Sequence, residues 1–82
     1  MNKRKLLLRI MARPANTQFA DLAAVVEGFG FRLSRVSGSH HIYVHPGVPE
    51  PVNLQKLEGK AKPYQIRQFL KLVEMYNLEL GE

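Results

Sequence analysis

The stretch FRLSRVSGSHHIYVHPG, residues 31–47, decides the fold. Apolar and polar side chains alternate imperfectly in residues 31–37 and cleanly in residues 40–45, and this period of two indicates β-strands. Gly38 and Ser39 stand between the two runs, and a two-residue link that contains glycine is typical of a tight hairpin turn. The stretch therefore predicts an antiparallel β-hairpin.

Alternation divides the side chains of the second strand between the two faces of the sheet. Ile42 and Val44 form an apolar pair, and we place them toward the core, which puts His40 on the same face. The opposite face then carries His41, Tyr43 and His45. A catalytic role for His40 requires its ring to be partly exposed, where the edge of the sheet meets the helix ends.

Apolar side chains at helical spacing precede and follow the hairpin. Asn16 or Thr17 is expected to cap the first of these helices, and Gly28 or Gly30 to end it. The second helix is expected within residues 62–80, with Pro63 at its first position. The positions at i, i+3, i+4 and i+7 are Phe19, Leu22, Ala23 and Val26 in the first helix and Ile66, Phe69, Leu70 and Val73 in the second.

Two further segments complete the order of elements. Residues 52–55, VNLQ, fit a short third strand after a loop that contains prolines. Lys3–Ala12 fits a short helix that ends before Pro14, because the residue before a proline avoids helical geometry. The sequence predicts an α+β fold, α-β-β-β-α, in which two helices cover one face of a three-stranded antiparallel sheet. We assign residues 1–15 to an N-terminal extension and residues 16–82 to the domain itself.

Length, charge and cysteine content limit the class of protein. The 82 residues fit one domain and contain no cysteine, which excludes disulfides and thiolate metal sites. Twelve Lys and Arg against seven Asp and Glu give a net charge of +5, which favours a polyanionic partner such as nucleic acid. Arg9 interrupts the apolar run near the N-terminus, so we expect neither a signal peptide nor a membrane span. We therefore expect a cytoplasmic protein without a membrane partner.

All three histidines of the chain lie in the second strand of the hairpin. One zinc ion cannot join them, because His40 and His41 point to opposite faces and His41 lies about 13 Å from His45 along a strand. Structural roles at the edge of the core or on the surface remain open for each ring. Imidazole is also the side chain best suited to proton transfer near neutral pH. His40, beside the turn, is the candidate for acid–base chemistry without a metal.

Two lysines before the last helix are candidates for phosphate binding. The helix dipole disfavours cations at a helix N-terminus, so Lys60 and Lys62 there would fit a bound anion. Gly59 would let the backbone approach that anion closely. The alternative is that both lysines are simply solvated, as surface lysines commonly are.

The combined pattern resembles a known family. Residues 28–46, GFGFRLSRVSGSHHIYVHP, and residues 52–80, VNLQKLEGKAKPYQIRQFLKLVEMYNLEL, are similar to the HicA toxins, the mRNA interferases of bacterial type II toxin–antitoxin pairs. The shared features are Gly-Phe at the end of the first helix, an arginine in the next strand, Gly-Ser-His-His, an aromatic position, His-Pro, and Gly-Lys before the final helix. The similarity covers about residues 19–80, and the pattern is specific over that length.

The resemblance implies a fold like that of a double-stranded-RNA-binding domain. It also implies cleavage of mRNA without a metal or cofactor, and neutralisation by a HicB-type antitoxin that covers the active surface. His40 falls at the catalytic position of the family, presented by Gly38 and Ser39. The candidates for binding RNA and its phosphates are Arg35, Ser39, His41, Lys60 and Lys62.

The sequence departs from the family in one place. Many members carry Pro-x-His-x-Gly-Lys before the last helix, whereas residues 54–60 are LQKLEGK, without a histidine. The acid that protonates the leaving group therefore remains open between His41, His45 and water. Two other functions compete with cleavage: a non-catalytic module that grips A-form RNA by its backbone, and a protein-interaction domain that docks a partner on the open sheet face near Ile42 and Tyr43.

Overall fold

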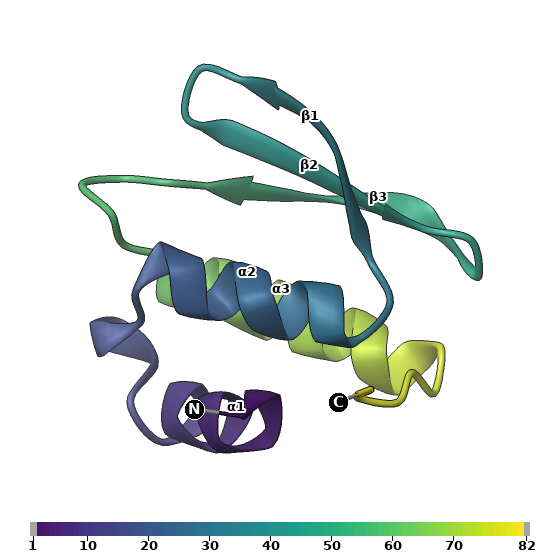
Figure 1. Ribbon diagram of the computed structural model, residues 1–82, viewed down its shortest axis with the longest axis horizontal. Coiled ribbons are helices and arrows are strands. Elements are labelled where there is room, and N and C mark those ends of the chain that lie inside the picture. The colour runs from purple at the N-terminus through teal and green to yellow at the C-terminus, as the bar shows by residue number, and fades with distance from the viewer. Residues whose placement is uncertain (1, 82) are drawn as a thin grey trace.

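The computed structural model describes residues 2–81, and it arranges them in three layers (Figure 1). A three-stranded sheet forms one outer layer, two helices form the middle, and the N-terminal helix lies beyond them. In chain order the elements are α1 (Lys3–Ala12), the 3-10 helix η1 (Pro14–Asn16), α2 (Phe19–Gly28), β1 (Arg32–Ser37), β2 (His40–His45), β3 (Val48–Gln55) and α3 (Pro63–Met75).

The sheet is antiparallel with the order β1-β2-β3, so β2 is central. Ser37 pairs with His40 across the hairpin, which confirms that residues 38 and 39 form the turn. On the other side of β2, Tyr43 pairs with Val52 and His41 with Leu54. The helices α2 and α3 cover one face of this sheet, and we call the other face the open face (Figure 1). The predicted α-β-β-β-α order and its layering are confirmed.

The hydrophobic core lies between the sheet and α2 and α3, and α1 closes its far side. Phe69 of α3 anchors an aromatic cluster, with ring centroids 5.6 Å from those of both Phe29 and Phe31. Leu6 and Ile10 are the buried side chains of α1, which packs on α2. The buried apolar residues are Leu6, Ile10, Phe19, Leu22, Val25, Val26, Phe29, Phe31, Tyr43, Val48, Val52, Leu54, Ala61, Ile66 and Phe69.

The prediction for the two faces of β2 was wrong. Tyr43 is 3% exposed and faces the helices, whereas Ile42 and Val44 are only half-buried. Alternation fixes which side chains share a face but not which face is covered. The register with β3 decides it, because the residues opposite His41 and Tyr43 are the buried Leu54 and Val52. His40 therefore lies on the open face.

Several element ends also differ from the prediction. Neither Asn16 nor Thr17 caps α2; Gln18 is the N-cap residue and makes no side-chain capping bond. Thr17 is buried instead, and its carbonyl accepts a hydrogen bond from the Ala61 amide at 3.1 Å. Gly30, with φ +96°, ends α2 as expected.

The strand β3 and the helix α3 have lengths other than those expected. β3 begins at Val48, four residues earlier than predicted, because its pairing with β2 continues through the proline-containing segment. α3 ends at Met75, and Asn77 follows with φ +51°. None of the helices within residues 2–81 is long and apolar enough to cross a lipid bilayer.

Candidate functional site

The β1–β2 turn places His40 on an exposed corner of the sheet. Gly38 has φ +59°, as the first position of a type II′ hairpin turn requires, and a side chain there would be strained. His40 follows directly as the first residue of β2, and it is exposed. The turn therefore presents an imidazole to solvent from a backbone that strand pairing holds on both sides.

A hydrogen bond orients the His40 ring and selects its tautomer. Nδ1 of His40 lies 3.0 Å from Oδ1 of Asn53, an exposed residue of β3. A carbonyl oxygen only accepts hydrogen bonds, so Nδ1 carries the proton and donates it. In the neutral ring Nε2 then holds the lone pair. His40 is thus an oriented base whose free nitrogen is not engaged with Asn53.

Ser39 is tied to its surroundings through its backbone and its side chain. Its carbonyl accepts hydrogen bonds from the Lys56 amide at 2.8 Å and from Nδ1 of His41 at 3.3 Å. Its Oγ accepts from Nε2 of Gln55 at 3.4 Å. The backbone N–H of Gln55 donates to Oε1 of the buried Gln65 at 3.3 Å, so α3 is linked to the turn through β3.

His41 lies on the opposite face from His40. Its half-buried ring packs on Phe19, with the ring centroids 4.6 Å apart, and Nδ1 donates to the Ser39 carbonyl. His41 therefore holds the turn against α2. It does not share the open face with His40.

His45 is a structural residue at the far end of β2. Its Nδ1 accepts from the Gly47 amide at 2.9 Å, and its ring centroid lies 5.0 Å from that of Phe31. A Cβ on Gly30 would come within 2.9 Å of Nε2 of His45, so the ring fills the space above that glycine. His45 lies five positions along the strand from His40, a distance of about 16 Å. The two imidazoles cannot act on one phosphate.

The predicted cations lie on β1, in the β3–α3 loop and at the start of α3. Arg35 of β1 pairs with Ile42, two residues along β2 from His40, and it is exposed. Lys60 is exposed in the loop before α3. Lys62 is the N-cap residue of α3, and its Nζ rests 5.9 Å from the ring centroid of Tyr64.

The loop that carries Lys60 is held rigidly. The backbones of Leu57 and Lys60 exchange two hydrogen bonds, at 2.9 and 3.1 Å, across a two-residue turn. Glu58 and Gly59 form that turn with φ of +52° and +76°, the two positive values of a type I′ turn. The carbonyl of Gly59 accepts from the Phe19 amide at 2.9 Å, which ties the loop to the start of α2.

The sequence that forms the hairpin, the loop and α3 matches a model of a protein family. The model describes the HicA toxin of bacterial toxin–antitoxin systems, and it matches residues 19–75, more than half of the chain. The chain belongs to the HicA toxin family. The curated proteins and the solved structures gave no match. In this HicA chain the helix α1 lies outside the matched residues, whereas the hairpin and the loop before α3 lie within them.

Three residues of this HicA chain were missed by the sequence analysis. Lys56 lies beside the turn, with Nζ 5.8 Å from the ring centroid of Phe19. Asn53 and Gln65 hold the ring of His40 and the strand beside Ser39, respectively. The register of β3 against β2 reveals Asn53, which lies 13 positions after His40 in the chain, and the packing of α3 reveals Gln65.

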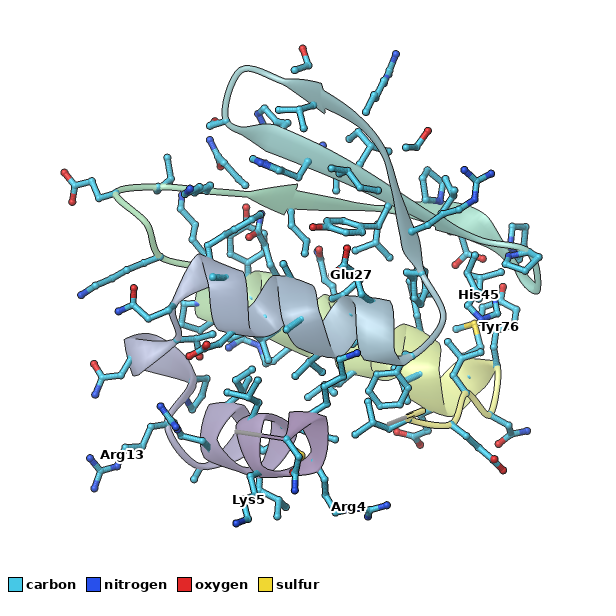
Figure 2. All side chains as sticks on the ribbon, viewed as in Figure 1. Arg4, Lys5, Arg13, Glu27, His45 and Tyr76 are labelled. Carbon is cyan, nitrogen blue, oxygen red and sulfur yellow. The ribbon has the colours of Figure 1, made fainter. Side chains whose placement is uncertain are left out.

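Two tyrosines with raised pKa values lie away from the ring of His40. Burial raises the pKa of Tyr43, and the nearby carboxylate of Glu27 raises it further. A hydrogen bond from the Tyr76 hydroxyl to Glu50 raises the pKa of Tyr76. Figure 2 shows Tyr76 and His45 at the end of the molecule opposite to Arg13. Within residues 2–81, no group of three His, Cys, Asp or Glu side chains is placed to hold a metal ion.

Proposed function

We propose that this HicA-family toxin is a metal-independent endoribonuclease that cleaves mRNA in the cytoplasm. One observation carries the proposal: His40 is exposed on the open face, and Asn53 holds its ring so that Nε2 is the free base. Nε2 would accept the proton of a ribose 2′-hydroxyl, and the oxygen would attack the adjacent phosphorus. The P–O bond to the next nucleotide breaks, leaving a 2′,3′-cyclic phosphate and a 5′-hydroxyl.

The cations near the turn supply the electrostatic part of this proposal. Arg35, which shares the open face with His40, would stabilise the charge that develops on the phosphorane. Lys56, whose Nζ lies over Phe19 on the other face, and Lys60 in the β3–α3 loop would attract the RNA backbone at longer range. Lys62 would contribute at longer range, because its Nζ lies 5.9 Å from the ring centroid of Tyr64. His41 and Ser39 would act by holding the turn in place.

The geometry narrows the choice of the acid for the leaving group. His45 is too distant, and His41 lies on the other face of the sheet. Of the three candidates for the acid, His41, His45 and water, we assign the role to water. An exposed corner gives water ready access to the 5′-oxygen.

A HicB-type antitoxin is the proposed protein partner. β1 is an edge strand, and its Leu33 and Val36 are 42% and 52% exposed. An unpaired strand edge with apolar side chains is a typical place for a partner to add a strand. A partner strand paired with this edge would lie beside Arg35, and we propose that the rest of the partner reaches over the open face and covers His40. Tyr43, which the sequence analysis placed on the docking face, is buried under the helices instead.

The test is cleavage of single-stranded RNA by purified protein in the presence of a chelator. His40→Ala is expected to lower the cleavage rate by roughly 10²- to 10⁴-fold, the usual contribution of a general base. Because His40 is exposed, the variant should keep the melting temperature of the parent protein. Cleavage at the parental rate by His40→Ala would refute the proposal.

The same assay separates cleavage from passive binding. A binding module would leave the RNA intact after long incubation while binding it in a salt-dependent manner. Products that end in a cyclic phosphate would exclude that function.

A further inference from the structure

A cavity of about 330 Å³ lies where α1, η1 and α2 meet, outside the cluster around His40. Ile10 forms an apolar part of its lining and is 3% exposed. The polar part combines two guanidinium groups, an amide, a hydroxyl and a carboxylate. The lining residues are Arg9, Ile10, Arg13, Asn16, Thr17 and Asp21.

One polar group in this lining has no partner within residues 2–81. Thr17 is 3% exposed, and its Oγ1 makes no hydrogen bond there. Buried hydroxyls are normally hydrogen-bonded, and an unsatisfied one calls for an explanation. A ligand with a donor or acceptor that reaches the bottom of the cavity would satisfy it.

The chemistry of the lining fits a nucleotide. The apolar part of the lining suits the face of a base, and the guanidinium of Arg13 suits a phosphate. The amide of Asn16 and the carboxylate of Asp21 suit the hydrogen-bonding edge of a base. A carboxylate accepts only, so Asp21 suits an N–H donor on the edge of a base.

A continuous path of backbone contacts joins the cavity to the turn of His40. The Lys56 amide donates to the Ser39 carbonyl, and Lys60 lies in a β-bridge with Gln18, which adjoins Thr17. The β1–β2 turn, the β3–α3 loop and η1 accordingly lie at the same end of the molecule (Figure 1). Figure 2 places Arg13 at this end as well.

Charge along this path favours an RNA strand. The basic residues on the segments of this path are Lys56, Lys60 and Arg13, with Glu58 as the acidic residue of the loop. The first 20 residues contain no Asp or Glu, whereas Lys3, Arg4, Lys5, Arg9 and Arg13 are basic. A single strand tracked by cations is the usual arrangement in proteins that bind unpaired nucleic acid.

We propose that the cavity is a second nucleotide subsite for the same single-stranded RNA. The strand passes from His40 along the β3–α3 loop, Arg13 binds a phosphate, and the cavity receives a base. The subsite lies partly on the N-terminal extension, outside the matched family residues, so it would give this chain a base preference away from the cleaved bond. The inference deepens the proposed function and rests on it for the identity of the ligand.

The experiment measures binding of a 2′-O-methyl RNA of about ten nucleotides. This RNA lacks the attacking hydroxyl, so binding is measured without cleavage. Each nucleotide is replaced in turn by an abasic one. We expect one position outside the cleaved dinucleotide at which loss of the base weakens binding about three- to tenfold, and we expect Asn16→Ala to abolish that dependence.

Arg13→Ala tests the phosphate contact against a matched control. Loss of one phosphate contact should reduce the slope of log Kd against log salt by about 0.7. Lys5→Ala also removes one positive charge, but Lys5 projects from the side of α1 that faces away from the sheet (Figure 2). The slope of the Lys5→Ala variant should equal that of the parent protein.

Equal effects of Arg13→Ala and Lys5→Ala, or no base-dependent position outside the cleaved dinucleotide, would overturn the subsite. Failure of the proposed function has a different signature, which is unchanged cleavage by His40→Ala. The two results come from separate assays, so either can fail while the other stands.

Discussion

At the scale of single residues, the decisive feature is the hydrogen bond between His40 and Asn53. An exposed imidazole rotates and changes tautomer freely, and a base that does so spends little time in the reactive geometry. The bond from Nδ1 to Oδ1 limits both freedoms, at a distance of 3.0 Å. Asn53 is thus a positioning residue that acts through His40.

Substitution of Asn53 tests this role. Asn53→Ala is expected to lower kcat for RNA cleavage roughly tenfold through lost orientation, with the pH profile unchanged. Asn53→Asp places a carboxylate beside the ring, which raises the pKa of His40. The base is then protonated up to a higher pH, so the acidic limb of the pH–rate profile moves to higher pH. The measurement is kcat against pH, and a purely structural role for Asn53 would leave that limb in place.

At the scale of elements, the loop between β3 and α3 determines where the cations stand. Its type I′ turn sets the positions of Lys56 and Lys60 on either side, and Gly59 ties it to α2. Glu58 occupies a position with φ +52°, where a residue with a Cβ other than Asn or Asp is strained. The loop therefore keeps its shape at some cost in stability.

Glu58→Asn should relieve that strain. Asn-Gly is the preferred pair for a type I′ turn, so we expect the free energy of unfolding to rise by about 0.5–1 kcal/mol. The control is Glu58→Ala, which removes the same charge and keeps a Cβ-bearing residue in the strained conformation. Denaturant titration compares the two variants. An equal gain in Glu58→Ala would mean that charge, and not backbone strain, limits the stability of the loop.

At the scale of the whole molecule, α1 is an integral layer of the structure. It closes the side of the helix pair that faces away from the sheet, through Leu6 and Ile10 (Figure 1). The face of the sheet away from the helices stays open. The cavity lies where α1, η1 and α2 meet. The N-terminal segment thus adds both burial and binding surface to the matched family residues.

Removing a buried side chain of α1 tests this integration. Ile10→Ala is expected to lower the free energy of unfolding by about 2–3 kcal/mol, through lost burial and the space left behind. Met11, the next residue, is 55% exposed, and Met11→Ala should change stability by less than about 0.5 kcal/mol. Thermal unfolding measures the stability of both variants. A small effect of Ile10→Ala would show that α1 is only loosely attached.

The sequence by itself determined the order of elements, because local signals carry that information. Glycine and proline marked the turns, the period of the apolar residues separated strands from helices, and the Gly38–Ser39 turn placed His40 at the start of its strand. These signals act over a few residues, so the end of α1 before Pro14 and the limits of β2 were also correct.

Only the tertiary structure decided which face of the sheet is covered and which side chains surround His40. The alternation in β2 is equally compatible with either face, and the pairing of Tyr43 with Val52 selected the face that holds His41 and His45. Asn53, Lys56 and the cavity beside Arg13 come together through strand register and helix packing. Contacts between residues far apart in the chain depend on how whole elements bury their apolar surfaces against one another, and no local pattern encodes them.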